Sequence, residues 1–247
     1  MRSGGVPTSE FAIVPVERLD VAFSSQRWAF ADKRRSEIDA YWADLVRQNP
    51  GLWNGRVLML GDFAIADGVF RGACFEVDYA SFLWWQDWGF PDPSVRDCFA
   101  MGCIQSSDGA FLLGVMGAHT FNAGQIYFPC GTPDLNDVAG NEVDFAGSIR
   151  REVAEETGLD VSEFVAEPGW RTVLGGSLVA HMRLLRARQT AEELRARMLD
   201  HMASEEMPEL SDVRIVRSEA DFDPMMPAFV MTFLRHIWSR PPWQPNA

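Results

Sequence analysis

The sequence contains almost no lysine. Lys33 stands alone among 22 basic residues, and 35 acidic residues bring the formal net charge to −13 at pH 7. A strongly negative protein lacks the positive potential that nonspecific binding to nucleic acid or to an anionic membrane requires. We therefore expect neither nucleic acid nor a membrane among its partners, and a ligand that carries phosphate would need cations supplied locally.

Cysteine is also scarce, and the four cysteines form no metal-binding pattern. Cys74, Cys98, Cys103 and Cys130 include no CxxC pair and have no neighbouring histidine at a zinc-like spacing. Free thiols are the default in a reducing compartment. The N-terminal residues lack the cationic start and apolar core of a signal peptide, and no apolar run approaches the length of a membrane span. These absences predict a cytoplasmic protein.

What is present is enough apolar sequence for a substantial core. With 247 residues and 47% hydrophobic content, the chain fits one large domain or a catalytic domain with an N-terminal elaboration. In residues 1–93 the apolar spacing predicts a helix, a hairpin about Asp67-Gly68 and an aromatic helix, over 32–48, 56–77 and 79–88. The tryptophans of the last helix fit core packing better than stacking on a ligand; they are Trp84, Trp85 and Trp88.

The segment Gly89–Pro93 is a break that we take as the domain boundary. Beyond it, periodicity predicts strands and helices in the order 99–105, 110–116 and 125–128 as strands, 144–157 as a helix, 170–188 as mostly strand, 190–203 as a helix, 212–216 as a strand and 228–238 as a helix. We thus divide the chain into the N-terminal elaboration 1–93, a catalytic domain 94–240 and a proline-rich tail 241–247.

Three glutamates crowd one flank of the predicted helix 144–157. Glu152, Glu155 and Glu156 have the spacing i, i+3, i+4, which makes them neighbours on a helical surface. Like charges so placed repel, and a divalent cation would offset the repulsion. Oxygen ligands alone favour Mg²⁺ first and Mn²⁺ second over zinc. The alternative is a solvated helix face on which Arg151 pairs with Glu155 and Gly158 ends the helix.

The segment REVAEETGL, residues 151–159, resembles the second half of the Nudix box, G-x5-E-x7-R-E-U-x-E-E-x-G-U, where U is a bulky aliphatic residue. The first half departs from this pattern. Gly131 precedes Arg151 by 20 positions where the pattern has 14, and the position eight before Arg151 is Val143 instead of glutamate. Asp144, which follows, is a candidate N-cap for the helix.

This resemblance implies an α/β fold, a Nudix-like α/β/α sandwich with a mixed sheet behind the N-terminal helix and hairpin elaboration. It also implies Mg²⁺- or Mn²⁺-dependent hydrolysis of the pyrophosphate bond in a nucleoside diphosphate that is linked to another group. Glu152, Glu155 and Glu156 would be the metal ligands, with Glu152 also catalytic. A general base would come from the box helix or from a later loop, where Glu209 is our choice over Glu205 and Glu206.

Substrate contacts are expected from Gly131, Arg151 and Arg186. Gly131 would offer its backbone, and Arg186 could clamp a phosphate from the strand that leads away from the box. For Arg151 the stronger expectation is that it orients Glu155 or the loop. Each of the two histidines His119 and His181 lies on a segment that could reach a pocket.

Scattered residues in the N-terminal part suggest the substrate. The layout of Tyr41-Trp42, Leu52–Gly55 and Asp78-Tyr79 is similar to that of eukaryotic Nudix pyrophosphatases acting on UDP-glucose and UDP-galactose. A nucleotide sugar such as a UDP-sugar is therefore the leading expectation, with ADP-ribose second. Two alternatives stay open: a catalytically inactive Nudix-fold nucleotide-binding module, and a protein-interaction module that uses the aromatic N-terminal layer. A homodimer also stays open.

Overall fold

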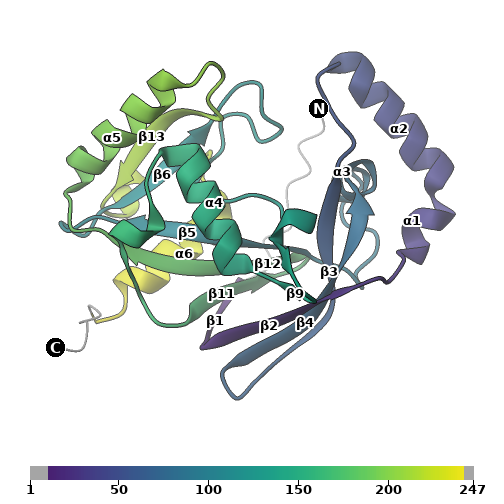
Figure 1. Cartoon of the computed structure of the whole chain (residues 1–247), viewed down its shortest axis with the longest axis horizontal. Coiled ribbons are helices and arrows are strands. Elements are labelled where there is room, and N and C mark those ends of the chain that lie inside the picture. The colour runs from purple at the N-terminus through teal and green to yellow at the C-terminus, as the bar shows by residue number, and fades with distance from the viewer. Residues whose placement is uncertain (1–10, 242–247) are drawn as a thin grey trace.

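The computed structural model describes residues 11–241, which form two β-sheets and six α-helices (Figure 1). Pro241 begins the predicted proline-rich tail, and the remainder of that tail lies outside the described residues. Between residues 11 and 241 no helix is both long enough and apolar enough to cross a membrane.

The large sheet is mixed, as predicted. Its strands run in the order β1-β11-β12-β5-β6-β13, with β10 added to β12 and β7 added to β6. The pair β5 and β12 is parallel, and the other pairs in this sheet are antiparallel. The strands are β1 (Ala12–Val16), β5 (Asp97–Gln105), β6 (Phe111–Met116), β7 (Ile126–Tyr127), β10 (Val165–Ala166), β11 (Trp170–Gly175), β12 (Leu178–Arg186) and β13 (Leu210–Val216).

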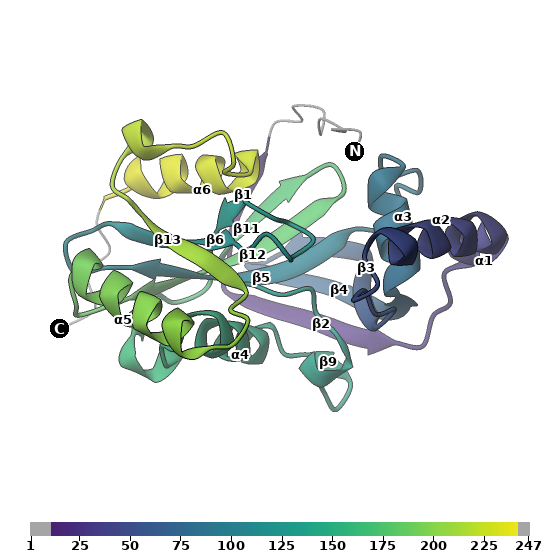
Figure 2. The same cartoon turned by 90° about the horizontal axis from the view of Figure 1, so that it is seen from above.

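Helices cover both faces of this sheet. α4 (Phe145–Thr157) and α5 (Ala191–Ser204) lie on one face, and α6 (Ala228–Trp238) lies on the other (Figure 2). The sandwich of helix, sheet and helix confirms the expected fold class. α5 begins with a capping box, in which the side chain of Thr190 accepts a hydrogen bond from the N–H of Glu193 and the Glu193 carboxylate accepts one from the N–H of Thr190.

The smaller sheet carries most of the N-terminal part. Its strand order is β3-β4-β2-β9-β8. The predicted hairpin is confirmed as β3 and β4, joined by Asp67 and Gly68 with φ of 51° and 72°, a conformation that suits a two-residue turn. The strands are β2 (Arg18–Ser24), β3 (Arg56–Ala66), β4 (Val69–Asp78), β8 (Val138–Ala139) and β9 (Glu142–Val143).

Three helices accompany the smaller sheet. They are α1 (Ala29–Lys33), α2 (Arg35–Gln48) and α3 (Tyr79–Asp87), so the single helix expected over 32–48 is interrupted at Arg34. On α3, Trp84 and Trp85 are buried in an aromatic core, whereas Trp88 is 54% exposed. Short 3₁₀ turns complete the chain: η1 (Leu135–Asp137), η2 (Val161–Glu163) and η3 (Glu219–Asp221).

The two parts of the chain exchange strands. β1, from the N-terminal part, pairs with β11 at the edge of the large sheet. In return β9, from the later part, pairs with β2 in the smaller sheet through Ala22 and Glu142. Residues 1–93 and 94–240 therefore contribute to each other's sheets instead of meeting only at a linker.

Helix α4 lies directly on β5, which fixes the position of its glutamates. Ile149 and Val153 are buried and face Gly102 of β5. A Cβ atom at Gly102 would lie 2.6 Å from Cγ2 of Val153, so the strand position must be glycine for the helix to approach this closely.

Candidate active site

The ends of α4 are defined by the residues that the sequence suggested. At its start, Oδ1 of Asp144 accepts a hydrogen bond of 2.8 Å from the N–H of Gly147. At its end, Gly158 adopts φ of 67°, the left-handed conformation that terminates helices. The last two turns of α4 carry the three glutamates.

Two of these glutamates are buried, and they lie against the loop that follows β7. Glu152 is 6% exposed and Glu156 is 3% exposed, while Glu155 is exposed. Oε1 of Glu156 accepts a hydrogen bond of 3.1 Å from the N–H of Cys130. A Cβ atom at Gly131 would overlap Oε1 of Glu152 and lie 2.6 Å from its Cδ, so only glycine admits the Glu152 carboxylate here.

The carboxylates strongly perturb one another. Burial, followed by the charges of Glu209 and Glu152, raises the pKa of Glu156 well above its usual value. Burial also raises the pKa of Glu152 to about 7; Arg151 opposes this rise, and Glu155 and Glu209 add to it. Ionisation of these carboxylates beside Gly131 is therefore unfavourable in the absence of a cation, and a bound cation would favour their charged forms.

Glu209 reaches this cluster from the segment that precedes β13. Its backbone carbonyl accepts a hydrogen bond of 2.7 Å from the N–H of Gly117. Partial burial raises the pKa of Glu209, the nearby His119 lowers it, and Glu155 raises it further. Glu209 is thus within electrostatic reach of the α4 glutamates, although, like Glu205 and Glu206 in the preceding loop, it is exposed.

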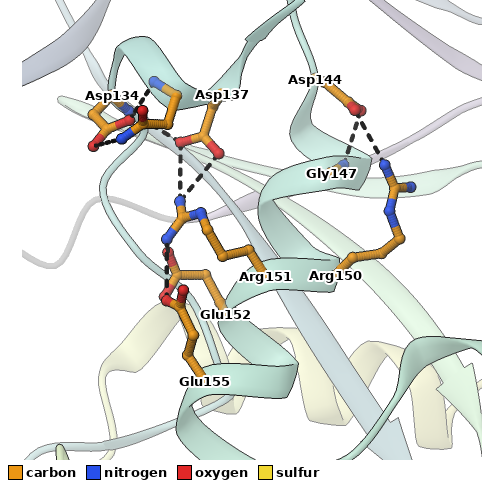
Figure 3. Close-up of polar contacts among 9 residues, drawn as sticks. Asp134, Asp137, Asp144, Gly147, Arg150, Arg151, Glu152 and Glu155 are labelled. Carbon is orange, nitrogen blue, oxygen red and sulfur yellow. Dashed lines mark hydrogen bonds and ion pairs between the residues drawn. The ribbon is translucent and has the colours of Figure 1, made fainter.

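Arg151 is held by acidic residues on two sides (Figure 3). Its Nη1 lies 2.6 Å from Oε1 of Glu152 and 3.3 Å from Oε2 of Glu155. Its Nη2 donates to both carboxylate oxygens of Asp137, at 3.0 and 3.2 Å. The side chain of Asp137 is only 2% exposed, and it also accepts a hydrogen bond from the N–H of Asp134. Arg151 therefore ties the loop after Gly131 to the glutamate side of α4.

Asp137 is the site residue that the sequence reasoning missed. It lies six positions after Gly131, the spacing that the box pattern gives to its first acidic residue. The extra residues follow it and form the β8–β9 hairpin, which joins the smaller sheet. The residue eight positions before Arg151 is Val143, which is 7% exposed and packs in the core. Counting forwards from Gly131 would have found Asp137.

A cavity of about 540 Å³ has Cys130, Gly131 and Thr132 in its lining. It is lined by residues of α3, β5, α6 and the loop before β7. Burial and then the charges of Asp97 and Glu209 raise the pKa of Tyr79, a lining residue. The cavity and the glutamate cluster are therefore within electrostatic reach of each other.

Other residues singled out in the sequence lie elsewhere. Arg186 is near the end of β12, with its Nη2 3.1 Å from Glu167, and the structure does not bring it to Gly131. His181 is fully buried, its Nδ1 is 2.9 Å from the hydroxyl of Thr172, and burial lowers its pKa to about 3, so it is a neutral core residue.

The donor set fits a hard divalent cation in its chemistry, although the side chains do not converge. Within residues 11–241 no three His, Cys, Asp or Glu side chains are placed so that they could hold a metal ion together. Glu152, Glu155, Glu156 and Glu209 nevertheless supply only oxygen ligands, and burial together with neighbouring acidic charges raises the pKa values of Glu152, Glu156 and Glu209. The side chain of Glu155 is 62% exposed and is paired with Arg151.

Neither a family model nor a curated protein matches the chain. Solved structures that match it include Nudix hydrolases. One is the Nudix hydrolase RenU from M. smegmatis, with 15% identity over 60% of this chain and 88% of that chain, at a TM-score of 0.38. Another is a MutT protein from Methanosarcina mazei Go1, with 18% identity over 57% of this chain and 96% of that chain, at a TM-score of 0.36.

A third match is a bifunctional NMN adenylyltransferase/ADP-ribose pyrophosphatase from Francisella tularensis, in complex with AMP and a manganese ion. It shares 14% identity over 64% of this chain and 44% of that chain, at a TM-score of 0.40.

Proposed function

We propose that this protein is a Nudix-type pyrophosphohydrolase that uses Mg²⁺ or Mn²⁺ to cleave the pyrophosphate bond of a nucleoside diphosphate linked to another group. One observation carries the proposal. Two buried glutamates of α4 lie against the backbone of Cys130 and Gly131, within electrostatic reach of Glu209 from a segment remote in sequence, and a cavity large enough for a nucleotide lies beside them.

Glu152, Glu155 and Glu156 would hold the metal. When bound, such an ion lowers the pKa of the attacking water and offsets charge on the phosphate oxygens. Glu209 would accept the proton of that water, a role suited to a carboxylate whose pKa is raised towards neutral pH. Arg151 would position Glu152 and Glu155 through its ion pairs and is itself anchored by Asp137.

For the substrate, we propose a nucleotide sugar such as UDP-glucose first and ADP-ribose second. The support is the sequence layout around Tyr41-Trp42 and Asp78-Tyr79, together with the position of Tyr79 in the wall of the cavity. The N-terminal part therefore contributes to the pocket, as a substrate larger than a nucleotide would require.

One observation favours the alternative of an inactive nucleotide-binding module. The carboxylates of the described residues do not form a ready metal cluster. A single assay separates the two functions. Wild-type protein is incubated with UDP-glucose, ADP-ribose, dinucleoside polyphosphates and coenzyme A, each with Mg²⁺, with Mn²⁺ and with EDTA. Release of a mononucleotide that depends on the metal supports the hydrolase. No release from any of these compounds contradicts it.

The matched variants are Glu156→Gln and Glu142→Gln. Glu156 is buried at the site, whereas Glu142 is exposed on β9. Both changes remove one carboxylate at nearly constant shape. We expect the first to lower turnover by at least about 100-fold, as loss of a group that stabilises charge at an active site does, and the second to leave it unchanged.

A further inference from the structure

The cavity beside Gly131 has a lining that does not suit phosphate. None of its lining residues is lysine or arginine, and it contains the carboxyl group of Asp97. An anionic phosphate placed there would lose its hydration without gaining a cation. The charged part of a ligand is therefore expected outside the cavity, by the glutamate cluster and its metal, and the uncharged part is expected inside.

The aromatic lining of the cavity favours a ligand with a planar ring. Aromatic side chains reach the cavity from several separate elements, among them Tyr79, Phe82, Phe90, Phe99, Phe121 and Phe229. They come from α3, from the segment after it, from β5, from the loop before β7 and from α6. Aromatic faces that line a cavity on several sides suit the stacking of a planar heteroaromatic group better than the many hydroxyl groups of a sugar.

Two polar side chains give the cavity a hydrogen-bonding edge. Nε2 of Gln86, on α3, donates a hydrogen bond of 3.3 Å to Oδ2 of Asp97, at the start of β5. No described residue donates a hydrogen bond to Oδ1 of Asp97, and the side-chain carbonyl of Gln86 accepts none. Burial raises the pKa of Asp97 to about 7, so near neutral pH its carboxyl group is protonated in much of the population and can donate. A donor then stands next to an acceptor, the arrangement that pairs with an amide-like base edge.

We infer that this cavity binds the nucleobase of the substrate, stacked on aromatic rings, with Asp97 and Gln86 hydrogen-bonded to the polar edge of the base. The inference rests on the proposed function for the identity of the ligand as a nucleotide. It assigns specificity to α3 and β5, which lie in the N-terminal part and the catalytic part respectively. The diphosphate would then lie at Gly131, which lines the edge of the cavity together with Cys130.

Binding of nucleotides and sugar phosphates to the full chain, measured without metal, tests the inference. In EDTA, calorimetric titrations compare UMP and AMP with glucose 1-phosphate and ribose 5-phosphate, which carry phosphate and sugar but no base. We expect at least one nucleotide to bind and the two sugar phosphates to bind at least about tenfold more weakly, because they lack a ring that can stack. Equal binding of all four, or preference for a sugar phosphate, overturns the inference.

Three variants make the test specific. Asp97→Leu keeps a similar side-chain size but removes the hydrogen-bonding group, so the affinity ratio of UMP to AMP should change by roughly tenfold, whereas a structural role alone would lower both affinities together. Phe121→Ala removes a ring that is 49% exposed and should weaken both nucleotides by about tenfold. Trp53→Ala, at a tryptophan 81% exposed and outside the cavity lining, is the control.

The outcomes separate this inference from the proposed function. If nucleotides bind through Asp97 but no diphosphate is hydrolysed, the base site stands and the hydrolase fails. If diphosphates are hydrolysed in a metal-dependent way while Asp97→Leu and Phe121→Ala leave nucleotide affinity and base preference unchanged, the hydrolase stands and the base site is wrong.

Discussion

The ion pair between Arg151 and Asp137 should be the strongest polar link between α4 and the loop after Gly131. The two residues share two hydrogen bonds, and the side chains are 35% and 2% exposed respectively. Truncating Arg151 to alanine leaves Asp137 and Glu152 as buried acids without this partner. Breaking a buried pair from one side costs about 3–5 kcal/mol, and exposed pairs contribute about 0–1 kcal/mol. For this half-buried arrangement we expect Arg151→Ala to lower the free energy of unfolding by about 2–3 kcal/mol.

The neighbouring arginine provides a matched control. Arg150 pairs with Asp144 at 3.2 Å, but both side chains are well exposed, at 60% and 41%. Arg150→Ala should therefore cost no more than about 0.5 kcal/mol. In a protein of this size each 1 kcal/mol moves Tm by about 2–4 °C, so the two variants should be clearly resolved in thermal and urea unfolding, both measured in EDTA.

A double-mutant cycle isolates the pair itself. Asp137→Ala and Arg151→Ala, singly and together, should show a coupling free energy of about 1–2 kcal/mol, because removing either residue already removes the shared hydrogen bonds. A coupling near zero, or an Arg150→Ala cost equal to that of Arg151→Ala, would refute the assignment of Asp137 as the acid that anchors the box arginine.

Three further predictions concern single positions. Glu156→Gln should raise Tm in EDTA while abolishing most turnover, since it removes a charge that burial and neighbouring carboxylates disfavour; a lower Tm would contradict that repulsion. Gly131→Ala should displace the carboxylate of Glu152, which should lower the free energy of unfolding by about 1–3 kcal/mol and lower turnover by at least about tenfold. Unchanged turnover would show that the close approach of Gly131 to Glu152 is not needed for activity. Asp97→Asn should stabilise the protein increasingly between pH 5 and pH 8. In the folded protein the pKa of Asp97 is about 7, which lies above its value in the unfolded chain. The wild-type protein therefore loses stability as pH rises towards 7, by roughly 2–4 kcal/mol in total. Parallel curves of unfolding free energy against pH for the wild type and Asp97→Asn would contradict this prediction.

Local sequence patterns predicted most elements of the fold. The apolar spacing of residues 228–238 and 190–203 placed α6 and α5 nearly to the residue, and the Thr190–Glu193 capping box was visible in the sequence. These features depend on residues a few positions apart. The pairing of β1 with β11 and of β9 with β2 depends on residues far apart in the chain, and no local period encodes it. The exchange of strands between the two parts was therefore not predictable.

The candidate site also combines features that local sequence predicts with features that depend on distant parts of the chain. The spacing of Glu152, Glu155 and Glu156 on one helix was readable, because it follows from helical geometry. Their contrasting environments were not, since burial of Glu152 and Glu156 depends on the approach of Cys130 and Gly131. The cavity was missed because its aromatic lining comes from elements that meet only in the folded chain. Its hydrogen-bonding edge, Asp97 with Gln86, spans the expected domain boundary.

Binding of a divalent metal ion by the carboxylates beside Gly131 is the property on which the proposed activity depends. Titration of the protein with Mn²⁺, followed by the loss of the free-ion signal in electron paramagnetic resonance, measures this directly and needs no knowledge of the substrate. We predict saturable binding by the wild type and by Glu142→Gln, and loss of at least one site in Glu156→Gln. Identical Mn²⁺ binding by all three proteins, or no binding by any of them, would contradict the account.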